Sequence, residues 1–410
     1  MNTHFTPQAA AAIATVAATG IAVVLPAIPL SKAVKQEPGT GARRGGKVEA
    51  VCANDSGDAK TLQEAIDSSG EGDEIVFKGP CLIDATITLL DHRTYRGVSK
   101  AGATIKQADG ANLPAMLASE SWAANRPYGS ETVRIEQLTL DGNRDHNTGT
   151  VGLMLRSWNS RVEDVDILGA PSDGIRVSNP SKNGTPLKNT MVNSIISDVY
   201  IEGSGGAGVR VLDPGNSVTD WVLERSWIAD SGTSAVELDN AAGWTLNGLH
   251  VYGVRRNAID AHRCFGTSIV NNYVEDFGGE GSAGRTYYGI RCDLQGEAAS
   301  VVSDNKIHNF PPLGAAARAG QPKALGQHAR PSKRSRTDYV YLALDQVNYG
   351  VGHAAVTGNT ILGHGTGRET GILYGKGQGR GMSVTSTGNL VDSVGVPRAA
   401  GRGVQLGRDY

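Results

Sequence analysis

The sequence has few aromatic residues, few cysteines and no excess of charge of either sign. Aromatic residues make up 5% of the 410 residues, and there are four cysteines. Lysine and arginine together number 39 against 41 for aspartate and glutamate, which gives a formal net charge of −2. A protein that coats nucleic acid needs a basic surface, so this balance argues against a nucleic-acid partner.

Long apolar segments are also missing after residue 30, and no Gly-X-Y period recurs. These two absences exclude a membrane protein with several spans and a collagen. The chain lacks a phosphate-binding P-loop, a GxGxxG turn after a strand and a GxSxG elbow. What it has instead is 54 glycines among regularly spaced valines and isoleucines. That composition is typical of many short strands joined by turns.

The N-terminal segment resembles an export signal. Residues 9–30 contain no charge, and Ser31-Lys32-Ala33 places small residues at the two positions that a signal peptidase reads. We expect a signal peptide over 1–33, a linker and the start of a cap over 34–54, and one domain over 55–410. An uncleaved N-terminal anchor is the alternative, because the segment is long enough to span a bilayer. The mature protein is expected to be secreted and not in a membrane.

The four cysteines are Cys52, Cys81, Cys264 and Cys292. An even number in an exported chain favours two disulfides, and Cys52–Cys81 with Cys264–Cys292 is the simplest of three connectivities. Buried free thiols are the alternative. No CxxC spacing is present, so a zinc site built from cysteines is not expected.

A repeat runs through most of the chain. Each unit reads apolar, any residue, apolar, then a turn, then Gly or Ala followed by apolar, any residue, apolar. The first apolar anchors of the units are Leu140, Ile167, Ile201, Ile228, Val251, Val274, Ile307, Ile361 and Val391. Each unit is too short to bury a core alone, so the units must stack, with every strand pairing with its copy one coil away. The repeat therefore predicts an all-β fold, a single-stranded parallel β-helix of about nine to ten coils.

Four asparagines support this prediction. Asn272, Asn305, Asn359 and Asn389 each lie two residues before an anchor. In stacked coils their amides would hydrogen-bond along the axis. Such a stack resembles the asparagine ladders of right-handed β-helix proteins.

Two segments depart from the repeat. Residues 58–69 predict a short capping helix at the N-terminal end, with Leu62 and Ile66 on its apolar side and a capping box over residues 61–64. Strands are expected at 74–78 and 85–89. Residues 311–337 form an insertion whose part from 318 to 336 contains six basic residues and no acidic one. It is either a solvated loop or a basic flap over an anionic substrate.

Alternation along the strands places ionisable residues in two outward columns. One column contains Met154, Arg176, Arg210, Glu237, Asp260 and Arg291, and the second contains Arg156, Ser178, Leu212, Asp239, His262 and Asp293. Stacked strands lie about 4.8 Å apart, so the charged members of three successive coils fall within about 10 Å.

Several chemistries suit this cluster. A histidine beside an arginine could abstract the proton next to a uronate carboxylate, and a pair of carboxyl groups could hydrolyse a glycoside. Asp239, Asp260 and Asp293 could bind Ca²⁺, which prefers oxygen ligands. The plain alternative is a charged ladder that keeps the sheet soluble.

The repeat resembles that of the pectin-lyase-like superfamily of right-handed parallel β-helix proteins. Two stretches, residues 138–145 and residues 257–262 with 274–276, resemble mannuronan C5-epimerases and related alginate lyases more closely. The family pattern Tyr-Gly-Phe-Asp-Pro-His matches this chain at Asp260 and His262, and the resemblance implies that both are catalytic. The family tyrosine falls at Asn257 and its proline at Ala261, so Tyr287 or Tyr288 would have to replace the tyrosine.

We therefore expect a secreted enzyme that acts on a polysaccharide and needs no cofactor. The favoured reaction is β-elimination or C5 epimerisation of a uronic-acid polymer. His262 would transfer the proton, Asp260 would orient it, and Arg291 or Arg210 would neutralise the substrate carboxylate, with Arg176 and Asp293 binding substrate.

Two alternatives remain open. One is a glycoside hydrolase or transglycosylase that uses Glu237 with Asp239 or Asp260. The other is a non-catalytic carbohydrate-binding β-helix. A homo-oligomer built on a flat face of the helix is compatible with any of these functions.

Overall fold

A computed structural model describes residues 45–282, 284–309, 338–365, 367–375 and 381–407. The expected signal peptide, most of the linker and the basic insertion at 311–337 lie outside these residues. The described part is dominated by strands, with two α-helices, α1 (Asp58–Asp67) and α2 (Glu120–Ala123), and two 3₁₀ turns, η1 (Ala101–Ala103) and η2 (Arg144–His146). Neither described α-helix is long and apolar enough to cross a membrane.

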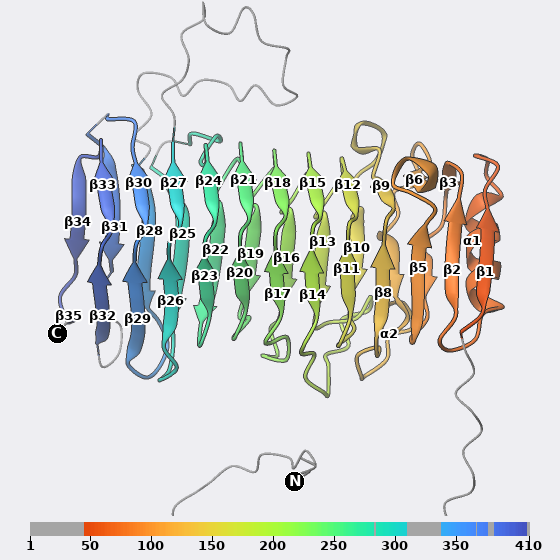
Figure 1. The fold of residues 1–410 in the computed structure, drawn as a ribbon, viewed down its shortest axis with the longest axis horizontal. Helices are drawn as coiled ribbons and strands as arrows, with labels where there is room; N and C mark the ends of the chain where they lie inside the picture. The colour runs from red at the N-terminus through yellow and green to blue at the C-terminus, as the bar shows by residue number, and fades with distance from the viewer. Residues whose placement is uncertain (1–44, 283, 310–337, 366, 376–380, 408–410) are drawn as a thin grey trace, which may run out of the picture. The chain divides into compact units, whose positions relative to one another are not determined.

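The strands form three parallel sheets, and the chain visits sheets A, B and C in turn (Figure 1). Sheet A contains β1 (Lys47–Val51), β2 (Glu74–Lys78), β5 (Arg93–Gly97), β8 (Val133–Glu136), β11 (Arg161–Glu163), β14 (Ile195–Ser197), β17 (Val222–Glu224), β20 (Thr245–Asn247), β23 (Ser268–Val270), β26 (Ser300–Ser303), β29 (Gly352–Thr357), β32 (Met382–Thr387) and β35 (Val404–Gly407).

Sheet B contains β3 (Cys81–Ile83), β6 (Thr104–Gln107), β9 (Thr139–Asp141), β12 (Asp166–Leu168), β15 (Tyr200–Glu202), β18 (Trp227–Ala229), β21 (His250–Tyr252), β24 (Tyr273–Glu275), β27 (Lys306–His308), β30 (Thr360–Leu362) and β33 (Leu390–Asp392). Sheet C contains β4 (Ile87–Leu89), β7 (Ala115–Ser119), β10 (Val151–Leu155), β13 (Ile175–Ser178), β16 (Val209–Leu212), β19 (Val236–Asp239), β22 (Ile259–Cys264), β25 (Thr286–Leu294), β28 (Asp338–Gln346), β31 (Glu369–Tyr374) and β34 (Val396–Ala400).

This arrangement is a parallel β-helix. Sheets B and C of the described part contain 11 strands each, slightly more than the nine to ten coils expected. The nine sequence anchors occupy the middle positions of β9 to β33 in an unbroken register. The two additional coils contain β3 and β6, which precede the first unit of the repeat.

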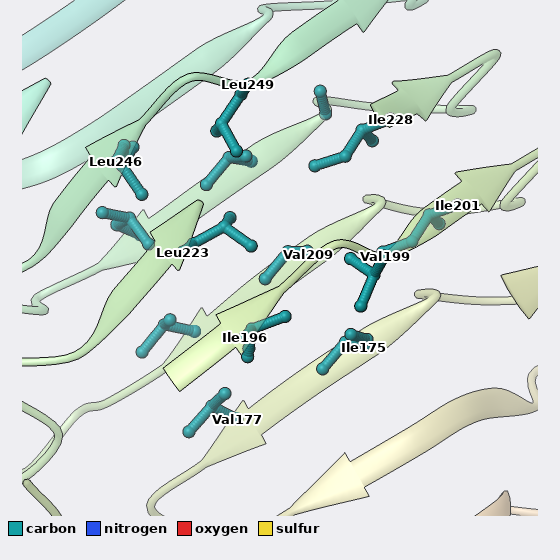
Figure 2. Close-up of a cluster of buried hydrophobic side chains, with 14 of the residues drawn as sticks. Ile175, Val177, Ile196, Val199, Ile201, Val209, Leu223, Ile228, Leu246 and Leu249 are labelled. Atoms are coloured by element: carbon teal, nitrogen blue, oxygen red, sulfur yellow. The ribbon is translucent and has the colours of Figure 1, made fainter. Parts of the chain in front are cut away.

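The core lies inside the coils, where branched aliphatic side chains from all three sheets meet. Figure 2 shows the layers of Ile175, Ile196 and Ile201 and of their neighbours in the next coils, all of them buried. Each coil adds one further layer, and burial of each such side chain contributes about 1.5–3 kcal/mol.

The Gly or Ala of the repeat lies at the corner between sheets B and C. At Gly208 a Cβ atom would lie 2.3 Å from Cγ2 of Ile228, the anchor of the next coil. At Gly174 it would lie 2.7 Å from Cγ2 of Ile201. The anchor side chain fills the corner, so only a very small residue fits beside it.

The expected asparagine ladder is present. The Asn272 side chain donates to Asn305, Asn305 donates to Asn359, and Asn359 donates to Asn389, each over 2.9 Å. Each amide also donates to a backbone carbonyl of a preceding coil, such as Ile269 O for Asn305. The ladder thus satisfies the buried polar groups of one turn through four coils.

The disulfides follow the simplest connectivity, with Cys52 bonded to Cys81 and Cys264 to Cys292. The helix expected at 58–69 is present as α1 and buries Leu62 and Ile66 against the first strands. The expected capping box is wrong, because the helix begins at Asp58 and residues 61–64 lie inside it. The carboxylate of Asp58 is buried and accepts backbone hydrogen bonds from residues 53, 55 and 82 instead.

Candidate functional site

The first outward column of sheet C is formed as the repeat predicts. Arg176 pairs with Arg210, Arg210 with Glu237, Glu237 with Asp260, and Asp260 with Arg291 on successive strands. Five charged side chains therefore follow one another across five coils. In the second column Leu212 pairs with Asp239, and Asp293 pairs with Asp345 of β28, a residue that the repeat did not reveal.

The N-terminal end of both columns is not exposed. Met154 is buried against Trp122 of α2. Arg156, expected to face outward, is fully buried, because β10 ends at Leu155 and the chain then turns. Its guanidinium donates to backbone carbonyls, including those of Asn179 and Arg126 at 2.8 and 2.7 Å. Burial lowers its pKa to about 10.

Arg176 and Arg210 are held by carboxylates. Asp173, in the turn before β13, accepts a 2.7 Å hydrogen bond from Arg176 and lies 3.7 Å from Arg210. Arg210 also donates to Glu237 over 2.6 Å. The two arginines proposed for substrate thus already have carboxylate partners, and Asp173, which the sequence analysis did not assign to the site, positions both.

Asp260 lies at the centre of the cluster, with only 6% of its surface exposed. Its Oδ2 accepts a 2.6 Å hydrogen bond from Asn257 Nδ2. Its Oδ1 lies 3.2 Å from His262 Nε2 and 3.8 Å from Arg291 Nη1. Burial acts to raise the pKa of this carboxyl, but His262, Asn257 and Arg291 outweigh it, and the pKa is lowered.

His262 carries the matching shift. The contact with Asp260 raises the pKa of the imidazole above its ordinary value, against the opposing effect of burial and of Arg291. An imidazole held in this way can exchange a proton near neutral pH while the carboxylate fixes its orientation.

Arg291 and Asp293 form the other half of the cluster. Arg291 donates twice to Asp293, from Nε over 3.0 Å and from Nη2 over 2.7 Å. The pKa of Asp293 is nevertheless raised to about 6, chiefly by burial and partly by the neighbouring Asp345, while Arg291 opposes the shift. The guanidinium also lies 5.5 Å from the ring centre of Tyr288. Burial also raises the pKa of Tyr288, and the opposing effect of Arg291 does not cancel this rise.

Of the two tyrosines considered, Tyr288 therefore lies at the cluster. The hydroxyl of Tyr287 instead accepts from the backbone of Ser282 and contacts Glu280. Asn257, at the position of the family tyrosine, bridges the coils, because its Oδ1 accepts from the backbone of Tyr288 while its Nδ2 holds Asp260.

Strand β22 contains a bulge at the cluster. Ala261 pairs with Cys292, but Cys264 rather than Arg263 pairs with Leu294, so His262 and Arg263 together lie opposite Asp293. The repeat gave no sign of this extra residue, because strict alternation places Arg263 inside. Bulges of this kind redirect side chains and are frequent beside active sites.

No group of three or more His, Cys, Asp or Glu within the described residues has the arrangement of a metal site. Ca²⁺ at Asp239, Asp260 and Asp293 thus stays a prediction. A separate hollow on sheet B, lined by Tyr273, Lys306 and His308 among others, contains none of the clustered residues.

Comparisons with known proteins identify the fold. A family profile described as a right-handed β-helix region matches residues 129–324. The A-module of the Azotobacter vinelandii mannuronan C-5 epimerase AlgE6 is similar, with a TM-score of 0.52, 15% identity and coverage of 90% of this chain and 98% of that one. The AlgE4 A-module from the same organism has a TM-score of 0.48, 16% identity and coverage of 90% and 98%.

A polygalacturonase from Erwinia carotovora ssp. carotovora has a TM-score of 0.46, 10% identity and coverage of 91% and 99%. The comparison with curated sequences gives no significant match. The three parallel sheets, the family profile and the match to the AlgE6 A-module together show that the chain has the right-handed parallel β-helix fold. At these identities the likeness extends to the fold, and the reaction must be argued from the side chains.

Proposed function

We propose that this protein is a secreted enzyme that acts on a uronic-acid-containing polysaccharide as a lyase or a C5-epimerase. The observation that supports this most directly is the arrangement around Asp260. The buried carboxylate of Asp260 contacts both His262 and Arg291, and these two residues lie on adjacent strands of sheet C. A proton-transfer group and a cation thus lie side by side, as abstraction next to a carboxylate requires.

The chemistry begins at C5 of a uronate. Neutral His262 takes the C5 proton, and the electron pair of the C–H bond moves toward the carboxylate, where a guanidinium stabilises the added negative charge. In elimination that pair then forms the C4–C5 double bond, the C4–O bond breaks, and the leaving oxygen takes a proton. In epimerisation C5 regains a proton on its opposite face. Tyr288 and Asp293 are the candidate donors, since each has a raised pKa beside Arg291.

A polysaccharide panel tests this proposal. Alginate, polygalacturonate, glucuronan, hyaluronan and neutral fructans and glucans would be incubated with the enzyme in D₂O. Elimination gives ultraviolet absorbance from the 4,5-unsaturated uronate. Epimerisation gives deuterium at C5 without that absorbance. Smaller products lacking both features would contradict the proposal and indicate hydrolysis.

Hydrolysis is the second candidate because Asp293 has a pKa of about 6. A carboxyl group whose pKa is raised toward neutrality can act as the general acid of a glycosidase. Glu237, the acid first considered, pairs with Arg210, as Asp293 pairs with Arg291. A hydrolase here would therefore lose activity in Asp293→Asn, and with Asp260 as its second carboxyl group it would also lose activity in Asp260→Asn.

Export and cofactor independence are parts of the same proposal. Cleavage after Ala33 would leave a mature chain that begins at residue 34, and intact mass spectrometry of the protein recovered outside the cell checks this. Chelation with EDTA should leave the activity unchanged. Activity lost on chelation and restored by Ca²⁺ would instead support a metal held by Asp239, Asp260 and Asp293.

A further inference from the structure

The bulge in β22 changes the position in the strand of Arg263, the residue that follows His262. Cys264, fully buried and bonded to Cys292, takes the interior place that alternation would give to Arg263. Arg263 is therefore displaced from that interior place, and its backbone lies with that of His262 opposite Asp293.

The charge of Arg263 is not balanced like that of the neighbouring arginines. Arg176, Arg210 and Arg291 each form an ion pair of 2.7 Å or shorter. In the described part of the chain, no carboxylate oxygen lies within 4.0 Å of the Arg263 guanidinium. The guanidinium makes one long hydrogen bond, from Nη1 to Asn240 Oδ1 at 3.5 Å.

Arg263 is also nearly buried. The residue is 7% exposed, and its Nε is buried without a hydrogen-bond acceptor among the described residues. Its guanidinium lies 5.7 Å from the ring centre of Phe265. A buried cation without a partner carries a desolvation cost that a bound anion would remove.

We infer that Arg263, steadied by Asn240 and Phe265, binds the carboxylate of a hexuronate residue beside His262. The inference rests on the proposed function and names the substrate-binding residue at that site. Arg291 then remains with Asp293 and Asp260, where it orders the proton-transfer groups. The anion that fits is a planar carboxylate, because a guanidinium can hold it through two parallel hydrogen bonds.

Calorimetric binding of trisaccharides of mannuronate, galacturonate and glucuronate tests this directly. Arg263→Gln should weaken binding of the preferred trisaccharide about 10- to 100-fold, as expected for a lost charge-assisted hydrogen bond. The matched control is Arg161→Gln on sheet A, which removes an exposed arginine from another face and should leave affinity unchanged. Binding in Arg263→Gln within twofold of the unmodified protein would overturn the inference.

The methyl ester of the same trisaccharide separates recognition from a structural effect. Without the substrate charge, the unmodified protein and Arg263→Gln should bind equally. A loss that is as large for the ester as for the acid would overturn the inference, because the variant would then have disturbed the fold.

Asn240→Asp gives a second variant that leaves Arg263 in place. A carboxylate at residue 240 would pair with the guanidinium and compete with substrate, so acid binding should fall while ester binding is kept. Unchanged acid binding contradicts the inference even if Arg263→Gln does not fold. Failure of the unmodified protein to bind any of the three trisaccharides also overturns it, whereas binding without turnover overturns only the proposed function.

Discussion

Asp260 shows how a single residue organises the cluster. Its two oxygens contact Asn257, His262 and Arg291, which come from the turn before its strand, from its own strand and from the next coil. The carboxylate is buried, so its charge is weakly screened and acts strongly on these neighbours. The pKa of His262 therefore depends on Asp260 more than on solvent.

The first prediction concerns the identity of the proton-transfer group. His262→Ala should lower lyase or epimerase turnover at least about 100-fold, the ordinary contribution of a positioned general base. Glu237→Gln should lower it far less, because Glu237 pairs with Arg210 and does not contact His262. Turnover on the preferred uronate polymer measures both, with thermal unfolding as the control for folding. Equal activity of His262→Ala and the unmodified enzyme would remove His262 from the mechanism.

The second prediction concerns pH. The Asp260 carboxylate raises the pKa of His262, so a neutral imidazole base becomes available only as pH rises through that raised value. Asp260→Asn removes the charge, the pKa of His262 falls, and the rising limb of the pH–rate profile moves to lower pH. An NMR titration of the His262 ring checks the same shift without substrate. A limb that stays in place or moves upward would show that Asp260 does not set this pKa.

At the scale of elements, the asparagine ladder joins coils that differ in length. Asn305 is fully buried, donates to Asn359 and to Ile269 O, and accepts from Asn272. The ladder passes directly from the coil before the 311–337 insertion to the coil after it. It therefore keeps the register of the sheets where the chain between them is longest.

The third prediction follows from this arrangement. Asn305→Ala leaves several buried donors and acceptors unpaired and should lower the free energy of unfolding by about 3 kcal/mol. Asn389→Ala, at the partly exposed end of the ladder, is the matched comparison and should cost less, because water can replace its bonds. Denaturant unfolding measures both variants. Equal losses would mean that burial does not set the strength of the ladder.

At the scale of the whole molecule, the two disulfides act on different regions. Cys52–Cys81 links the segment after β1 to β3 near the N-terminal end, whereas Cys264–Cys292 joins β22 to β25 directly beneath the cluster. Both bonds close loops of similar length, since the sequence separations are 29 and 28 residues. Their effects on stability should therefore be similar and their effects on the site different.

The fourth prediction uses this contrast. Replacing either pair with alanine should lower the free energy of unfolding by about 3–4 kcal/mol, from the entropy of the opened loop. Only the Cys264→Ala, Cys292→Ala pair should also weaken substrate binding, because it frees the bulge that holds His262 and Arg263. Calorimetry and trisaccharide binding give the two readouts. Equal binding by both double variants would contradict a role for the second disulfide in the site.

The coils, their register and the first outward column from Arg176 onward could all be predicted from the repeat. A repeat indicates these features directly, because each anchor must face the core and every second residue must then face outward. The asparagine ladder followed for the same reason, and the disulfide pairing was the simplest of the connectivities that the cysteines allow. Asp260 and His262 could be placed on the outer face because their positions obey the alternation, and the family resemblance singled them out as catalytic.

The departures from alternation could not be predicted in this way and became visible in the folded structure. Arg156 turns into the protein because its strand ends one residue earlier, and Arg263 gives up its interior place to Cys264 because a bulge adds one residue to β22. Asp173 and Asp345 join the cluster from a turn and from the strand after the insertion. These outcomes depend on where pairing stops and on which partner each charge finds, and both are set by contacts between coils that are distant in the chain.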